Sequence, residues 1–139
     1  MSFKVDGTPS PQGSKTIASN KSRSKVWLRD KNPKGLAAWR DAVEASARAQ
    51  AAAHGAFTTP FRADITFYMK RPQRPKFDVP GVRPDKDKLL RATMDALTKS
   101  GLIADDSLDV AGDVLKLYAD AENAPGALIT ITHYRKDTQ

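Results

Sequence analysis

The chain has 139 residues, of which 40% are hydrophobic, and its 23 Lys/Arg against 16 Asp/Glu give a formal net charge of +7. This length and apolar content indicate one folded domain with its own core. The absence of cysteine excludes disulfides and thiolate metal sites, and two histidines are too few for a histidine-rich metal centre. Any metal must therefore be bound by oxygen, as Mg²⁺, Mn²⁺ and Ca²⁺ are. No apolar run is long enough to span a membrane and no signal pattern is present, so we expect a cytoplasmic protein.

The charge is distributed unevenly along the chain. Residues 1–84 carry 16 Lys/Arg and 6 Asp/Glu, a balance of +10, whereas residues 85–139 carry 7 and 10, a balance of −3. A basic first part can attract a polyanion such as nucleic acid, and an acidic second part can hold a cation. Solubility alone would also account for the basic excess, and composition does not decide between the two.

The first elements are a strand, a basic loop and a second strand. Apolar and polar residues alternate over residues 3–6, which predicts a short strand that glycine and proline then end. The following segment is rich in Lys, Arg and Ser and has no helical periodicity. We predict a basic loop over about residues 8–25, which is either simply solvated or contacts phosphates, and then a strand at residues 25–28.

A helix and a strand follow. Asn32 is a candidate N-cap with Pro33 at the first helical position, and an alanine-rich stretch with a regular apolar face runs to about His54 before Gly55. Residues 61–69 alternate apolar and polar, which predicts a half-buried strand. Residues 70–84 contain four prolines and five cationic side chains and cannot form regular structure. This loop is either a plain connector or, as its charge and position favour, a substrate-facing loop.

The remaining elements complete an α+β domain. A regular apolar face predicts a helix from about residue 87 to residue 100, before a glycine. This face consists of Leu89, Leu90, Thr93, Met94 and Leu97. Strands are predicted at residues 114–118 and 127–134, followed by a polar tail over residues 135–139. The order of elements predicts one domain over residues 1–139, with a small mixed β-sheet and two main helices packed on it.

Aspartates bracket the second helix. Asp85 and Asp87 are two residues apart, so they share a side only in extended backbone; we predict Asp85 at the end of an extended piece and Asp87 in the first helical turn. Asp106 reaches them only if the chain turns back after the helix. Gathered carboxylates repel each other and are typical of a divalent-cation site. Alternatively, Asp85 is an N-cap with no metal. A calcium loop of EF-hand type is disfavoured, because such a loop has glycine at its sixth position and glutamate at its twelfth. Counted from Asp85, these positions hold Leu90 and Ala96.

Arg91 has two interpretations. It follows Asp87 by four residues and precedes Asp95 by four, so the three side chains share one helical face. They could form an exposed ladder of ion pairs, each worth roughly a few tenths of a kcal/mol. Arg91 could instead bind a scissile phosphate and stabilise its developing charge. The spacing leaves both open.

The aspartate region resembles the RusA family of Holliday-junction resolvases, many of them encoded by phages and prophages. The match runs without gaps over about 22 residues, and the opening loop at residues 7–15 is also similar. The matching groups are Asp85-Lys86-Asp87, Arg91, Asp95-Ala96-Leu97, Lys99-Ser100-Gly101 and Asp105-Asp106. In this pattern Arg91 stands where the family usually has an essential lysine, and Lys88 where asparagine is common. Lysine and arginine are not interchangeable at a phosphate.

The resemblance implies a homodimeric, structure-selective endonuclease that makes paired, symmetric nicks in four-way DNA junctions with Mg²⁺, for which Mn²⁺ could substitute. It places Asp85, Asp87 and Asp106 as metal ligands and catalytic residues and Arg91 as catalytic, and leaves open whether Asp105 or Asp109 assists. Alternatives are a junction-binding accessory protein that has lost cleavage, and a nuclease for flaps or other branched DNA. The cationic side chains expected to contact DNA are Lys15, Lys21, Arg23, Lys25, Lys70, Arg71, Arg74, Lys76, Arg83 and Lys88.

Overall fold

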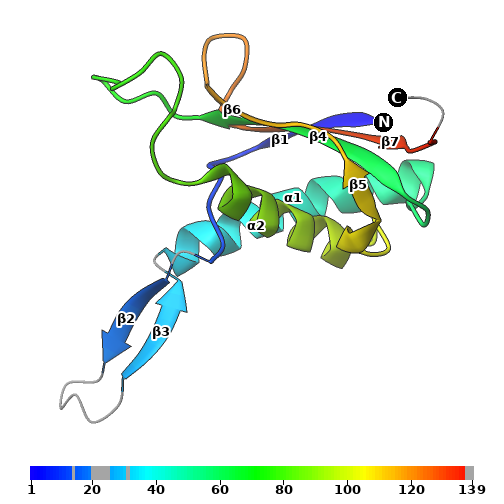
Figure 1. Ribbon diagram of the computed structural model, residues 1–139, viewed down its shortest axis with the longest axis horizontal. Coiled ribbons are helices and arrows are strands. Elements are labelled where there is room, and N and C mark those ends of the chain that lie inside the picture. The colour runs from blue at the N-terminus through cyan, green and yellow to red at the C-terminus, as the bar shows by residue number, and fades with distance from the viewer. Residues whose placement is uncertain (14, 20–25, 31, 137–139) are drawn as a thin grey trace.

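A five-stranded mixed sheet forms one layer of the protein (Figure 1). The computed structural model describes residues 1–13, 15–19, 26–30 and 32–136. The strand order is β1-β7-β4-β5, with β6 also paired to β4; β4 runs antiparallel to β7 and parallel to β5 and β6. The strands are β1 (Ser2–Asp6), β4 (Phe61–Met69), β5 (Asp109–Ala111), β6 (Val114–Tyr118) and β7 (Gly126–His133).

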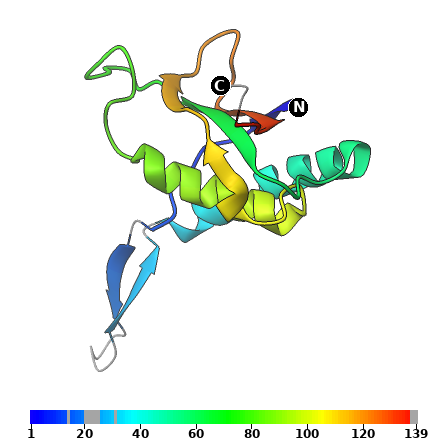
Figure 2. The same cartoon turned by 45° about the vertical axis from the view of Figure 1, so that its right-hand side comes forward.

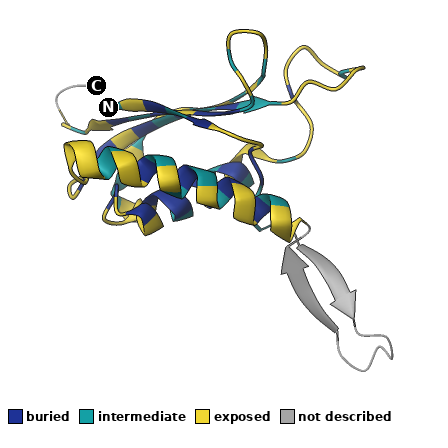
Figure 3. Cartoon of the chain, turned by 180° about the vertical axis from the view of Figure 1, so that it is seen from behind, coloured by how far each residue is buried: buried dark blue, intermediate teal, exposed yellow. Residues whose placement is uncertain are grey.

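Two helices, α1 (Pro33–His54) and α2 (Lys86–Ser100), cover one face of this sheet. Figure 3 shows that the sides of the helices turned to the sheet are buried and the opposite sides exposed. The predicted α+β architecture, a small mixed sheet with two main helices on it, is therefore confirmed. Within the described part of the chain, no helix is long and apolar enough to cross a membrane.

Local sequence accounts for the start of α1. The Asn32 side chain accepts a hydrogen bond from the Gly35 amide at 3.1 Å, and Pro33 occupies the first turn, where its missing N–H costs nothing. The predicted helix is confirmed at both ends. Its buried face consists of Leu36, Trp39, Val43 and Ala47.

The core lies between the helices and the sheet, and α2 is held in it by packing and by one polar contact. Leu89 and Leu97 are fully buried on α2, as are the alternate residues Phe61, Ile65 and Phe67 on β4. The Trp39 indole N–H donates to Thr93 Oγ1 at 3.1 Å, and this hydroxyl in turn donates to the Leu89 carbonyl at 2.9 Å. The helix is thus fixed against α1, and with it the position of its first turn.

The predicted basic loop before α1 is partly wrong. Residues 15–19 form a strand, β2 (Lys15–Ser19), antiparallel to β3 (Val26–Asp30). The strand predicted at residues 25–28 is confirmed as β3, displaced by one residue at its start and two at its end. The hairpin projects from the body beside the beginning of α1 (Figures 1 and 2). Its sequence lacks the apolar alternation of β4 because a two-stranded ribbon outside the main sheet has no core to face.

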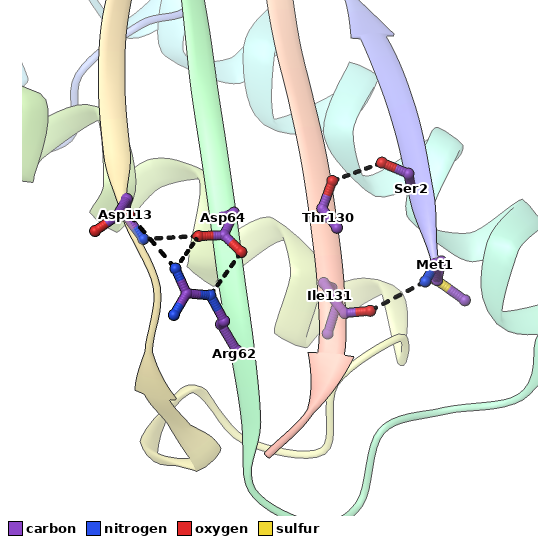
Figure 4. A network of polar contacts seen from close by, with 7 residues as sticks. All are labelled: Met1, Ser2, Arg62, Asp64, Asp113, Thr130 and Ile131. Carbon is purple, nitrogen blue, oxygen red and sulfur yellow. Dashed lines mark hydrogen bonds and ion pairs between the residues drawn. The ribbon is translucent and has the colours of Figure 1, made fainter. Parts of the chain in front are cut away.

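A tight junction joins β5 to β6 along the edge of the sheet. Gly112 has φ +124°, and a side chain there would come within 1.9 Å of the Ala63 carbonyl oxygen, so only glycine permits this approach to β4. Figure 4 shows a polar network beside it: Asp64 accepts from the Arg62 guanidinium at 2.9 and 3.0 Å and from the Asp113 amide at 2.9 Å. Arg62 also pairs with the Asp113 carboxylate at 3.4 Å. Together these contacts fix where β6 begins.

Candidate active site

The start of α2 presents two carboxylates. Asp85 is in extended backbone (φ −70°, ψ 143°), and its carbonyl accepts from the Lys88 and Leu89 amides at 3.2 and 3.1 Å. Asp87 lies in the first helical turn, and both side chains are exposed. This is the predicted arrangement. Asp85 occupies the N-cap position, but its carboxylate makes no capping hydrogen bond. The Asp85 carboxylate therefore does not serve as a helix cap, which was the alternative to a metal-binding role.

A shallow hollow of about 450 Å³ lies beside these carboxylates. Its walls come from the end of the proline-rich loop, the start of α2 and one side chain of β6, Lys116. The Lys116 ammonium donates to the Val82 and Pro84 carbonyl oxygens, both at 2.7 Å. Burial lowers the pKa of Lys116 below its usual value, and the negative charge of Asp85 offsets only part of this effect. Sequence reasoning missed Lys116, because a single lysine in a strand carries no local signal of what it faces.

Asp106 lies at a different place along α2. It begins the short 3₁₀ helix η1 (Asp106–Leu108), and the Asp105 side chain caps that helix by accepting from the Ser107 amide at 2.9 Å. This hydrogen bond lowers the pKa of Asp105. The pKa of Asp106 is raised by its hydrogen bond with Asp105, then by burial and by the negative charges of Asp105 and Asp95. Asp106 therefore lies near other carboxylates, Asp95 among them.

The three predicted metal ligands are not gathered within one chain. Asp95 follows Asp85 by ten residues, which places it about 15 Å along the helix axis at 1.5 Å per residue. Figures 1 and 2 show the chain leaving the far end of α2 before it returns as β5. Among the described residues, no group of three or more His, Asp or Glu is close enough to hold a metal ion. The pair Asp85 and Asp87 and the aspartates around Asp106 are thus two separate groups of carboxylates on the same chain.

Arg91 does not form the ion-pair ladder that its spacing allowed. Across the described ranges, no ion pair joins it to Asp87 or Asp95. The Asp95 carboxylate instead accepts a hydrogen bond from the Gln12 side chain, through Nε2, at 2.5 Å. The backbone N–H of Gln12 donates to the Lys88 carbonyl oxygen at 3.0 Å. The opening loop therefore rests on α2, and a side chain at Gly13 would come within 3.0 Å of the Arg91 guanidinium. Arg91 is exposed, as a phosphate-binding side chain must be.

Asp109 is a further carboxylate near Asp106. Burial raises its pKa, backbone hydrogen bonds from Ala63 and Ala111 lower it, and the charges of Asp64 and Asp106 raise it. Its Oδ1 is buried and has no hydrogen-bond partner among the described residues. Asp109 thus extends the group of carboxylates around Asp106 inward, whereas the Asp105 carboxylate already caps η1.

The cationic side chains fall into three groups. Those of the 70–84 loop are exposed: Lys70, Arg71, Arg74, Lys76 and Arg83. Lys88 is half-buried, with its ammonium 3.9 Å from the Asp85 carboxylate. Of the N-terminal candidates, Lys21, Arg23 and Lys25 lie outside the described residues, and only the backbone of Lys15 is described, in β2. The loop, as predicted, contains no helix or strand and leads directly to Asp85.

Comparison with known proteins identifies one family. The family model described as endodeoxyribonuclease RusA matches residues 6–132. The match includes both helices, strands β4 to β6, all but the last residue of β7, the 70–84 loop and the aspartates at both ends of α2, and it begins at the last residue of β1. A search of the curated proteins finds no match.

Proposed function

The chain belongs to the RusA endodeoxyribonuclease family, and from that premise we propose that it resolves four-way DNA junctions by paired, symmetric nicks. The observation that carries the proposal is the carboxylate pair at the start of α2. Asp85 and Asp87 are exposed and unused by the helix, and a loop with five exposed cationic side chains leads into them. An acidic site next to a basic surface suits a cation that acts on a phosphodiester.

The donor set fits Mg²⁺, with Mn²⁺ as a possible substitute. Carboxylate oxygens are the ligands that these hard cations prefer, and Asp87 has no ion-pair or hydrogen-bond partner within the described part of the chain to displace. Asp106, whose pKa is raised by neighbouring carboxylates, would be relieved by a bound cation. We assign Asp85, Asp87 and Asp106 as the metal ligands. A bound cation supplies a nucleophilic water at neutral pH and offsets the charge that develops on the phosphate.

The chain's own residues bind and orient the DNA in this proposal. Arg91, on the same face of α2 as Asp87, can hold a phosphate through two parallel N–H donors and stabilise its charge during attack. The cationic side chains of the 70–84 loop contact phosphates of a junction arm, and those of residues 15–25 contact another. The β2–β3 hairpin, which includes the backbone of Lys15, projects from the body (Figure 2).

A homodimer completes the site. One chain keeps Asp106 beside Asp95, on the order of 15 Å along α2 from Asp85. In a two-fold dimer each surface meets its counterpart, so Asp106 of a second copy can approach the Asp85 and Asp87 pair, and the reverse contact follows by symmetry. Two such sites would cut two strands of a junction symmetrically. We expect the enzyme to act in the cytoplasm of a bacterial or phage-infected cell.

One assay separates this proposal from its alternatives. Wild type and Asp87→Asn are incubated with a four-way junction, a fork and a linear duplex, each with and without Mg²⁺, and cleavage and binding are measured separately. We expect Mg²⁺-dependent nicks on the junction that the variant loses while it still binds. Junction binding without cleavage by the wild type would identify a binding protein instead. Preferential cutting of the fork would identify a nuclease for other branched DNA.

A further inference from the structure

The hollow at the start of α2 includes one side chain from the sheet. Its other walls come from residues 81–83 and 85–87, whereas Lys116 enters from β6. The edge strand β6 pairs with β4 through the register Phe67↔Lys116. The backbone of Lys116 is thus paired with a strand inside the sheet, whereas the loop that its side chain contacts contains no helix or strand. Lys116 therefore links a rigid element to the segment that carries the candidate ligands.

The contacts of Lys116 concern the backbone just before Asp85. Its ammonium bridges the carbonyl oxygens of Val82 and Pro84, at 2.7 Å each. Pro84 has no N–H, so this stretch has fewer backbone donors with which to anchor itself. Among the described residues, no backbone–backbone hydrogen bond ties residues 82–84 to the sheet. The two bonds from Lys116 are thus the polar attachment of this segment to the sheet.

The side chain of Asp85 does not anchor it either. It makes no capping hydrogen bond, and its only ion pair within the described ranges is with Lys88, at 3.9 Å. The direction in which the Asp85 carboxylate points is therefore set by the backbone on either side of it. On the C-terminal side that backbone is α2, and on the N-terminal side it is the segment held by Lys116.

We propose that Lys116 is a positioning residue for the carboxylates at the start of α2: by bridging the Val82 and Pro84 carbonyls, it holds Asp85 where a divalent cation binds. The inference rests on the proposed metal-dependent cleavage and extends it to a residue that does not itself touch the reacting atoms. Outer residues that orient metal ligands typically contribute 10–100-fold to metal affinity. Removal of the bridge is expected to weaken metal binding by about that factor.

Lys4 provides a matched control. It is also a strand lysine whose ammonium donates to a backbone carbonyl, that of Ala124, at 2.8 Å. It lies on β1, at the edge of the sheet opposite β5 and β6. Lys116→Met and Lys4→Met therefore each remove one positive charge and at least one lysine–carbonyl bond, but only the first touches the segment before Asp85.

The test measures Mn²⁺ binding to the full chain by electron paramagnetic resonance and amide hydrogen exchange across residues 81–87. We expect Lys116→Met to raise the Kd for Mn²⁺ by about 10–100-fold and to speed exchange in this stretch, with Lys4→Met like the wild type in both. Junction cleavage should fall in kcat with KM unchanged, because the DNA contacts remain. If Lys116→Met does not fold, Lys116→Gln against Lys4→Gln makes the same comparison, since glutamine is too short to reach both carbonyls.

Each outcome decides the role of Lys116. The proposal would be overturned if Lys116→Met and Lys4→Met bind Mn²⁺ with equal affinity. It would also be overturned if the wild type shows no detectable Mn²⁺ binding. Faster exchange at residues 81–87 with unchanged Mn²⁺ affinity would also overturn it, because Lys116 would then only stabilise the loop. Absence of junction cleavage by a wild type that binds Mn²⁺ would refute the proposed function instead, and the Mn²⁺ comparison would still decide whether Lys116 positions Asp85.

Discussion

Mixing two inactive variants tests whether the metal site is shared between copies. The perturbation is an equal mixture of Asp87→Asn and Asp106→Asn. Each variant alone has both sites broken if the site combines Asp85 and Asp87 of one copy with Asp106 of the other. In a mixed dimer, one site receives both substitutions and the other receives none. Cleavage should therefore reappear only after the subunits exchange.

The magnitudes follow from the structure and from symmetry. Asp106 lies near Asp95, which is about 15 Å along α2 from Asp85, whereas two oxygens on one Mg²⁺ lie within about 4 Å of each other. Random exchange makes about half of the dimers mixed, each with one intact site of two, so the mixture should recover about one quarter of the wild-type site concentration. The assay is nicking of a labelled junction, with subunit exchange verified by native mass spectrometry.

The matched control is a mixture of Asp85→Asn with Asp87→Asn. Both substitutions remove a carboxylate from the pair at the start of α2, so every site of a mixed dimer lacks one ligand and the mixture should stay inactive. If the Asp87→Asn and Asp106→Asn mixture is no more active than this control after verified exchange, the shared-site reasoning is wrong. Activity in either unmixed Asp variant would instead show that its carboxylate is not a required ligand.

Three further predictions concern α2 and the sheet edge. Thr93→Val leaves the buried indole N–H of α1 without an acceptor, and should lower the free energy of unfolding by about 1–3 kcal/mol in urea melts; Thr98→Val, which removes only a partly buried bond to its own helix, should cost much less. The hydrogen bond from Arg62 lowers the pKa of Asp64 in the folded state. The contribution of Asp64 to stability is therefore present above its unfolded-state pKa and is lost as the pH falls through the lower folded-state pKa. Asp64→Asn should flatten the loss of stability below about pH 4, and an unchanged acid melting curve would contradict this. Arg91→Lys should retain substantial junction cleavage because it keeps the charge, and its complete loss would mean that the two-pronged guanidinium is required.

Most of the fold follows from local pattern. Strand β4 and both helices were predictable because their buried faces repeat at strand or helix spacing over nine or more residues. The strands that were missed, β2 and β5, have no such repeat: β2 belongs to a hairpin outside the main sheet, and β5 has three residues. Its pairing with β4 depends on a distant approach that Gly112 permits, which no local window contains.

The candidate site divides in the same way. The extended conformation of Asp85 and the helical position of Asp87 were predictable from Pro84 and from the apolar face that follows. Where Asp106 would lie was not, because that depends on how the chain returns from the end of α2. Lys116 was missed for a related reason: its partners, the Val82 and Pro84 carbonyls, are more than thirty residues earlier in the chain. Backbone acceptors also have no residue type by which a sequence could announce them.

Strand-by-strand mapping of nicks on a labelled four-way junction treated with the wild type and Mg²⁺ tests most directly whether the protein resolves junctions. We expect two nicks at symmetry-related positions flanking the branch, with 5′-phosphate ends that DNA ligase can reseal, and no cuts in the matching linear duplex. No nicks at all, or equal cutting of the duplex, would contradict it.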